Sequence, residues 1–176
     1  VGVYGPDGRG LAAHLDGRDN VVVLRTCGKA LGVEGALLCL PRLFREFLVN
    51  RGRGFIFSTA PSPLMARAVG EALRILADAP ERREALQQRV RLAEQVLGEA
   101  GVQASGSQII PVIIGEDARA MRVAAMLQAS GYDVRGIRPP TVPAGTSRLR
   151  ISVTLNASEA EIRGLGDALQ AAMRAA

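Results

Sequence analysis

Residues 21–32 read Val21-Val22-Val23-Leu24-Arg25-Thr26-Cys27-Gly28-Lys29-Ala30-Leu31-Gly32, and this stretch decides the fold. The near-continuous apolar run over residues 20–25 predicts a strand buried on both faces of a parallel sheet. A glycine-flanked turn follows and places Lys29 at the end of that sheet, where α/β proteins hold their ligands. We therefore expect an α/β fold with a candidate ligand site at this turn.

Lys29 is the only lysine among the 22 lysines and arginines of the chain. An arginine keeps its charge at any ordinary pH, whereas a lysine can lose its proton and act as a nucleophile or a base. The single lysine therefore indicates that position 29 requires an amine rather than a guanidinium. The alternative, an ordinary surface lysine in an arginine-rich chain, stays open on this residue alone.

We predict that the chain has two regions, and that Pro80 marks the boundary between them. Residues 1–80 are expected to form the C-terminal part of a larger α/β sheet, and residues 81–176 a small α+β domain with helices over one face of its sheet. The expected elements are a short helix near 11–15, a second apolar run at 36–40, a helix at 41–50, a strand at 55–57, helices at 63–78 and 81–99, a strand at 109–114, a helix at 117–130, strands at 133–137 and 148–154, and a last helix opened by a capping box at 158–161.

Composition excludes several classes of protein. A hydrophobic content of 48% is typical of a packed globular protein rather than a disordered one. The net charge of +5 comes with arginines scattered among acids and only 3% aromatic residues, which argues against nucleic acid as a partner. No apolar stretch is long enough to span a membrane, and no secretion signal is evident. Cys27 and Cys39 suggest neither a zinc site nor a disulfide, so we expect free thiols and a cytoplasmic location.

Two further segments carry candidate binding residues. Ser58 and Thr59 precede a predicted helix, where hydroxyls bind an anion or simply cap the helix. Prolines fix an extended loop over residues 139–143, and the strand after it places Arg148 and Arg150 on the same face. An arginine on a strand can clamp a carboxylate through its paired N–H groups, and an ion-paired or surface arginine is the simpler alternative.

The chain resembles the C-terminal half of an α-oxoamine synthase, a fold-type-I enzyme dependent on pyridoxal 5'-phosphate. The resemblance covers essentially the whole chain and rests on four segments in the family's order. These are Gly2-Val3-Tyr4-Gly5 with Gly8-Arg9-Gly10, Thr26-x-Gly28-Lys29-Ala30-Leu31-Gly32, Phe55-Ile56-Phe57-Ser58-Thr59, and Thr141-Val142-Pro143-x-Gly145-Thr146-x-Arg148-Leu149-Arg150.

The resemblance implies roles for four residues toward the cofactor. Lys29 would form the Schiff base with pyridoxal phosphate and, once freed by the amino acid, remove the α-proton. Thr26 would bind the cofactor phosphate. Because the family's sites form at a homodimer interface, Ser58 or Thr59 would reach the phosphate of the partner subunit's cofactor.

The resemblance also implies the substrates. Arg150 would hold the amino-acid carboxylate, and Thr141 would lie near the substrate. Residues 137–143 are most similar to the biotin-pathway branch of the family, which joins L-alanine to a pimeloyl thioester, carried on CoA or on acyl carrier protein, with loss of carbon dioxide. Two alternatives remain: a member that makes aminolevulinate or 2-amino-3-ketobutyrate, and a non-catalytic arginine-rich binding protein.

Some features depart from the family's pattern. Members carry an aspartate and a histidine before the opening glycine loop, and an aromatic that stacks on the cofactor; the chain opens at Val1 without them. We therefore expect a fragment of a longer polypeptide that is inactive alone and binds cofactor weakly. Arg25 replaces a small or apolar residue, and no role is assigned to it or to His14.

Overall fold

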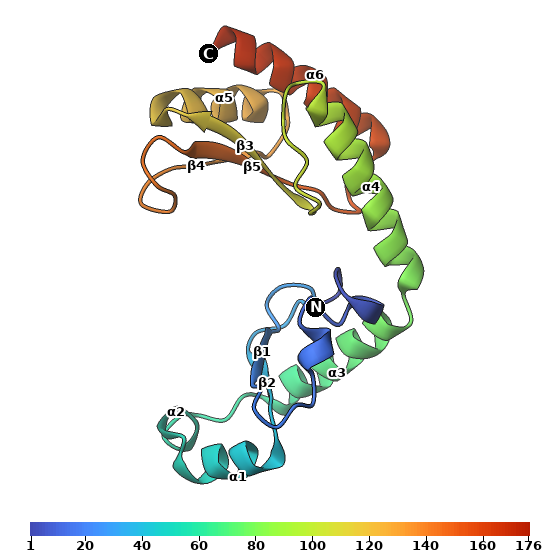
Figure 1. Cartoon of the computed structure of the whole chain (residues 1–176), viewed down its shortest axis with the longest axis vertical. Coiled ribbons are helices and arrows are strands. Elements are labelled where there is room, and N and C mark those ends of the chain that lie inside the picture. Colours follow the sequence, from blue (N-terminus) through green and yellow to red (C-terminus); the bar gives the residue numbers. More distant parts are fainter. The chain divides into compact units, whose positions relative to one another are not determined.

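The structure is a computed structural model that describes residues 1–176. It divides into two compact units, a first unit of Val1–Arg83 and a second unit of Glu84–Ala176 (Figure 1). Each unit is described by itself below. That the first unit belongs to a larger cofactor-binding domain stays a prediction.

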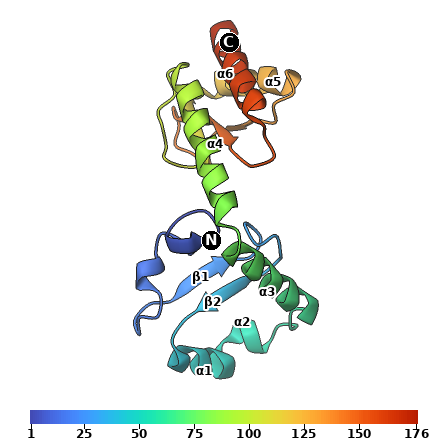
Figure 2. The same ribbon diagram turned by 90° about the vertical axis from the view of Figure 1, so that its right-hand side faces the viewer.

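The first unit is built on a two-stranded sheet. Strand β1 pairs antiparallel with strand β2, with Val23 opposite Cys39 and Thr26 opposite Ala36. Helix α3 lies beside the two strands (Figure 2). The elements of this unit are the 3-10 turns η1 (Pro6–Gly8) and η2 (Ala13–Leu15), the strands β1 (Val23–Thr26) and β2 (Ala36–Cys39), and the helices α1 (Arg42–Arg51), α2 (Arg53–Ile56) and α3 (Pro63–Ala77).

The prediction that residues 20–25 form a strand of a parallel sheet, buried on both faces, is wrong for β1. Its one neighbour, β2, follows it through the short turn at 27–35, and so short a connection can only return the chain antiparallel. Leu24 is 62% exposed because no element of this unit covers its side of the sheet. An apolar run therefore marked the strand correctly but did not reveal which of its faces are covered.

The predicted strand at 55–57 is also wrong, because Arg53–Ile56 forms the short helix α2. The carbonyl of Gly52 accepts hydrogen bonds from the N–H groups of Phe55 and Ile56, both at 2.9 Å. Strand preference depends on a neighbouring strand and on side-chain packing, and this unit offers the segment no strand to pair with. The Arg53 guanidinium lies 5.8 Å from the ring centroid of Phe57, within cation–π range.

The core of the first unit is small. Cys27, Leu31 and Val69 are buried together, and apolar side chains of β2 and α3 pack against them. Helix α3 begins where the sequence predicts, with Pro63 in its first turn and the Ser62 hydroxyl accepting from the Leu64 N–H at 3.2 Å. Both cysteines are free thiols, Cys27 buried and Cys39 exposed.

The second unit has the predicted order of helix, strand, helix, strand, strand, helix. Its three-stranded antiparallel sheet has the order β3-β5-β4. The bounds are α4 (Pro80–Gly98), which begins in the first unit, β3 (Ile109–Gly115), α5 (Asp117–Ala129), β4 (Arg135–Ile137), β5 (Ser147–Ser152) and α6 (Glu159–Ala175).

The helices of the second unit lie on the same side of its sheet, as expected (Figure 1). Residues Ile110 and Val112 of β3 and Leu149 and Ile151 of β5 are buried on that side. Gly136 permits close packing of β4, since a Cβ there would lie 2.8 Å from the sulfur of Met121 on α5. The opposite side of the sheet carries the more exposed residues of the same strands.

The two predicted helix features at the ends of this unit are confirmed. Helix α4 buries Val90, Ala93 and Leu97 at helical spacing. Helix α6 opens with a capping box, in which the Ser158 hydroxyl accepts from the Glu161 N–H at 3.2 Å and the Glu161 carboxylate accepts from the Ser158 N–H at 2.6 Å. No helix of the chain combines the length and apolarity needed to cross a membrane.

Candidate active site

Lys29 lies in the turn that follows β1, beside a hollow of about 230 Å³ that Thr26 also lines. Both side chains are exposed, and neither makes a hydrogen bond or ion pair with another residue. The amine and the hydroxyl are therefore free to meet a ligand.

The turn around Lys29 is held firmly by its backbone and by its buried neighbours. The Cys27 N–H donates to the Gly35 carbonyl at 2.9 Å, and the Val33 N–H donates to the Cys27 carbonyl at 3.1 Å. Cys27 and Leu31, on either side of the lysine, are 1% and 4% exposed. The exposed amine thus stands on a turn whose flanks are anchored in the core.

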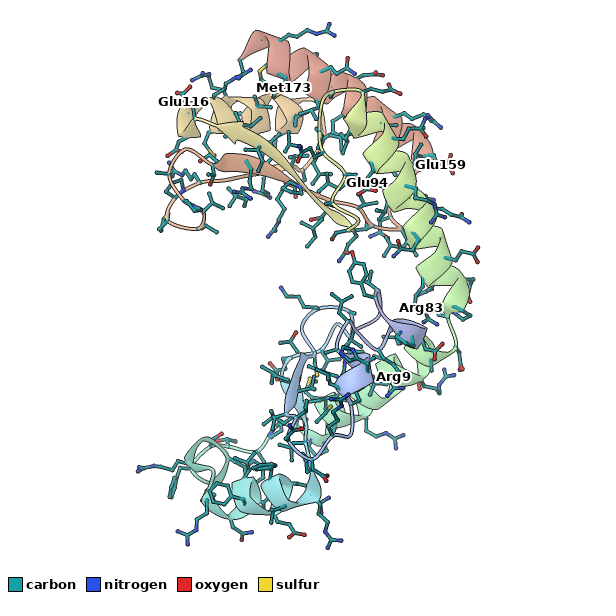
Figure 3. All side chains as sticks on the ribbon, in the orientation of Figure 1. Arg9, Arg83, Glu94, Glu116, Glu159 and Met173 are labelled. Atoms are coloured by element: carbon teal, nitrogen blue, oxygen red, sulfur yellow. The ribbon has the colours of Figure 1, made fainter.

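Arg25 has a partner that the sequence did not reveal. Its guanidinium donates to both carboxylate oxygens of Asp16, at 2.7 and 2.9 Å, and to the backbone carbonyl of Arg9. The Arg9 side chain, labelled in Figure 3, reaches the same carboxylate at 3.2 Å. Arg25 also lines the Lys29 hollow. The interaction fastens the N-terminal loop to β1, and no periodic signal in the sequence predicts a pair nine residues apart.

Ser58 and Thr59 follow α2, and both are exposed. Neither caps a helix, because Ser62 caps α3. The simpler alternative for these two hydroxyls is therefore wrong, and they remain without a hydrogen-bond partner in the chain.

Thr141 and Arg150 belong to the second unit. Thr141 is exposed in the loop before β5. Arg150 lies on the open side of β5 together with Arg148, as predicted, and it has no hydrogen bond or ion pair. Arg148 donates instead to the carbonyl of Thr146 at 3.0 Å. Arg150 is therefore not ion-paired, but it is an exposed surface arginine, so that form of the simpler alternative stays open.

A buried polar contact that the sequence did not indicate fixes the start of β5. Ser147 is fully buried, and its hydroxyl donates to the Asp117 carboxylate at 2.6 Å. Asp117 is the first residue of α5, so the bond joins the strand that carries Arg150 to the helix beneath it. A buried hydroxyl needs such a partner, and burial could not be read from the sequence at this position.

The residues around Lys29 fit pyridoxal phosphate in their chemistry. A free amine can hold an aldehyde carbon covalently, and a free hydroxyl three residues earlier in the chain can donate to a phosphate. These two groups lie on one hollow of the first unit.

The chain belongs to the aminotransferase class I and II family, whose model matches residues 1–169. This is a family of pyridoxal-phosphate enzymes, which confirms the fold class and the cofactor expected from the resemblance.

Individual relatives show which kind of enzyme within the family the chain is similar to. The chain is 44% identical over 178 residues to a putative 8-amino-7-oxononanoate synthase of Desulforudis audaxviator, matching 100% of this chain and 46% of the relative. It is 43% identical to the 8-amino-7-oxononanoate synthase of Anaeromyxobacter dehalogenans, over 96% of this chain and 43% of the relative. The chain thus spans about half the length of the curated relatives it matches.

A solved structure agrees with these relatives. The Sphingomonas wittichii serine palmitoyltransferase superposes with a TM-score of 0.88 at 27% identity, over 99% of this chain and 45% of that one. The expected resemblance to α-oxoamine synthases is therefore confirmed.

Proposed function

We propose that the protein to which this chain belongs condenses L-alanine with a pimeloyl thioester, with release of the free thiol and of carbon dioxide, to give 8-amino-7-oxononanoate. The observation that carries this proposal is Lys29. It is the only lysine, and it is unpaired beside Thr26 at the end of β1. A relative at 43% identity bears the name of this synthase, and one at 44% is named a putative synthase of the same kind.

Lys29 has two tasks in this reaction. Its Nζ would hold pyridoxal phosphate covalently and, when free, would accept the α-proton of the substrate. Pyridoxal phosphate, when bound, withdraws electrons from the α-carbon and so makes that proton removable. The exposed, unpaired position of Lys29 supports both tasks.

Three hydroxyl groups are proposed to bind the phosphate of a cofactor. Thr26 donates to the phosphate of the cofactor bound by its own subunit. Ser58 or Thr59 donates to the phosphate of the partner subunit's cofactor in a homodimer. The absence of any internal partner for Ser58 and Thr59 supports this assignment.

Arg150 is proposed to hold the carboxylate of alanine through two parallel N–H···O bonds, and Thr141 to lie near the bound substrate. The carrier of the acyl group is CoA or an acyl carrier protein.

The test is covalent trapping. The protein is incubated with pyridoxal phosphate, reduced with borohydride and digested, and the peptides are weighed. We expect a pyridoxyl group on Lys29, and none at residue 29 in Lys29→Arg, which keeps the charge without an accessible free amine. A full-length protein that takes no label at Lys29 would refute the catalytic proposal and favour the non-catalytic one.

A substrate panel separates the members of the family. Alanine, glycine and serine are offered to the full-length enzyme with pimeloyl thioester. Preference for alanine supports the proposal, and preference for glycine would indicate a member that makes aminolevulinate or 2-amino-3-ketobutyrate.

A further inference from the structure

The side chain of Arg25 joins β1 to the N-terminal loop, residues 1–16. Its Nη2 donates to both oxygens of the Asp16 carboxylate, at 2.7 and 2.9 Å, and its Nη1 donates to the carbonyl of Arg9. The side chains of Arg25 and Asp16 are 16% and 20% exposed, so water screens this pair less than it screens an exposed pair. The loop is therefore fastened to the strand by charge-assisted hydrogen bonds in a half-buried position.

The same loop also touches the chain at the other end of residues 26–29. Gly2 packs against Ala30 so closely that a Cβ on Gly2 would lie 3.1 Å from the Ala30 Cβ. The Gly2 N–H donates to the Gly8 carbonyl at 2.6 Å, which ties this contact to the rest of the loop. Arg25 directly precedes residues 26–29, and Ala30 directly follows them. The N-terminal loop therefore braces both ends of the segment that carries the candidate amine and hydroxyl.

The Arg25 guanidinium is not free to bind a ligand itself, because both of its Nη atoms already have acceptors in the chain. The hollow of about 230 Å³ is lined by Arg25, Thr26 and Lys29 and by apolar residues, and no acid lines it. Its two unpaired polar groups are the Thr26 hydroxyl and the Lys29 amine. A ligand held at two points depends on the distance between the groups that hold it, whereas a ligand held at one point does not.

We infer that Arg25 is a positioning residue for the hollow of Lys29. Through Asp16 and the N-terminal loop it keeps the Thr26 hydroxyl and the Lys29 amine at a fixed separation, so that one ligand can reach both. The inference rests on the proposed function, in which the amine takes the aldehyde of pyridoxal phosphate and the hydroxyl takes its phosphate. Arg25 then determines how strongly the site prefers a phosphorylated aldehyde over the same aldehyde without phosphate.

The test compares pyridoxal phosphate with pyridoxal, two aldehydes that differ only by the phosphate. Each is titrated into the full-length protein and trapped with borohydride, and the labelled fraction of Lys29 is measured by peptide mass spectrometry. We expect the parent to reach half-labelling at a lower concentration of pyridoxal phosphate than of pyridoxal. Arg25→Gln should raise that concentration about tenfold for pyridoxal phosphate, within the range of coupling between residues in contact, and leave it unchanged for pyridoxal. A loss of stability alone would affect both aldehydes alike.

A double variant tests whether Arg25 acts through Thr26. Thr26→Val removes the hydroxyl and should remove the preference for pyridoxal phosphate, so adding Arg25→Gln should change nothing further. Asp16→Asn keeps the shape of its side chain and weakens the same pair, so it tests the inference even if Arg25→Gln does not fold. It should reduce the preference in the same direction. An unchanged preference in either single variant, or the same further loss in the Thr26→Val background, overturns the inference.

The matched control is Arg74→Gln. Arg74 pairs with Glu71 at 2.6 Å, but this pair is exposed and neither residue lines the hollow of Lys29. Both titrations should therefore match those of the parent. Each variant is first compared with the parent by thermal melting, so that a folding defect is recognised.

Failure of the inference and failure of the proposed function give different results. A parent that labels Lys29 equally with both aldehydes keeps the role of the lysine and overturns the positioning of Thr26. A parent that takes no label at Lys29 from either aldehyde refutes the proposed function. The brace is then measured by hydrogen exchange at the Gly32 N–H, which donates to the Lys29 carbonyl at 3.1 Å and should exchange faster in Arg25→Gln. Unchanged exchange there overturns the brace as well.

Discussion

The two units of this chain differ in how much of their apolar surface they bury. The second unit encloses a core of fifteen buried side chains drawn from three helices, from β3 and β5, and from Val134 and Val153 beside the strands. The first buries three in its cluster and leaves large apolar side chains in the open, among them Leu43 at 74%, Phe55 at 65% and Phe57 at 77% exposed. Burial of apolar area is the dominant stabilising term in folding. The second unit therefore gains far more stabilisation from its own residues than the first.

The comparison also concerns the candidate site. The turn that carries Lys29 belongs to the unit with the smaller core. There a partly buried ion pair, Arg25 with Asp16, joins the N-terminal loop to β1. In the second unit the strand that carries Arg150 rests on a large core and on the buried Ser147–Asp117 bond. Polar contacts therefore have a larger share in holding the turn of Lys29 than in holding the strand of Arg150.

The largest expected effect comes from separating the units. Residues 84–176 alone should melt cooperatively and give dispersed amide resonances. Residues 1–83 alone should bind a hydrophobic dye and show no sharp transition, because much of their apolar surface is uncovered. A cooperative transition in the first piece and none in the second would reverse the comparison.

A substitution in each unit tests the same contrast. Leu149→Ala, at a position with no exposed surface, should lower the free energy of unfolding by about 2–5 kcal/mol through a cavity in the core. Leu24→Ala, at a strand position that is 62% exposed, should change it by less than about 0.5 kcal/mol. Urea unfolding followed by circular dichroism measures both, and equal losses would contradict the contrast.

The ion pair of the first unit should have an intermediate effect. Arg25 and Asp16 are 16% and 20% exposed, so Arg25→Leu should cost about 1–2 kcal/mol, less than a fully buried pair. It should also speed hydrogen exchange at the Gly10 N–H, which donates to the Tyr4 carbonyl in the loop that Arg25 fastens.

The control for this effect is Arg42→Leu. The Arg42–Glu46 pair of α1 has a similar distance, 2.7 Å, but is exposed, so its loss should cost less than about 0.5 kcal/mol. Unchanged exchange at Gly10 in Arg25→Leu would show that the loop is held by other contacts.

The smallest expected effect concerns the start of α6. Hydrogen bonds from Ser158 lower the pKa of the Glu161 carboxyl below its ordinary value. A lowered pKa means that the stabilising contribution is fully present above the ordinary carboxyl pKa and is lost as the pH falls through the lowered value. The melting temperature should therefore fall less steeply with acid in Glu161→Gln than in the parent chain. Parallel curves would show that the capping box does not contribute to this acid sensitivity.

The sequence by itself determined the features that depend on neighbours along the chain. Helical spacing predicted α3, α4 and α5, and the Ser158–Glu161 spacing predicted the capping box, because these interactions join residues three or four apart. The order of the four motifs was enough to indicate, by resemblance, the family and its cofactor. The free thiols and the common face of Arg148 and Arg150 followed from spacing in the same way.

Only the tertiary structure decided which surfaces are covered and which charges meet. The apolar run at 20–25 could not show that β1 has one antiparallel neighbour and an open side, and the aromatic segment at 55–57 became helical where no strand was available for pairing. Arg25 with Asp16, Ser147 with Asp117, and Arg135 opposite Arg150 are contacts between residues 9, 30 and 15 positions apart. Such pairs depend on how the elements pack and on strand register. Neither can be predicted from the local sequence pattern.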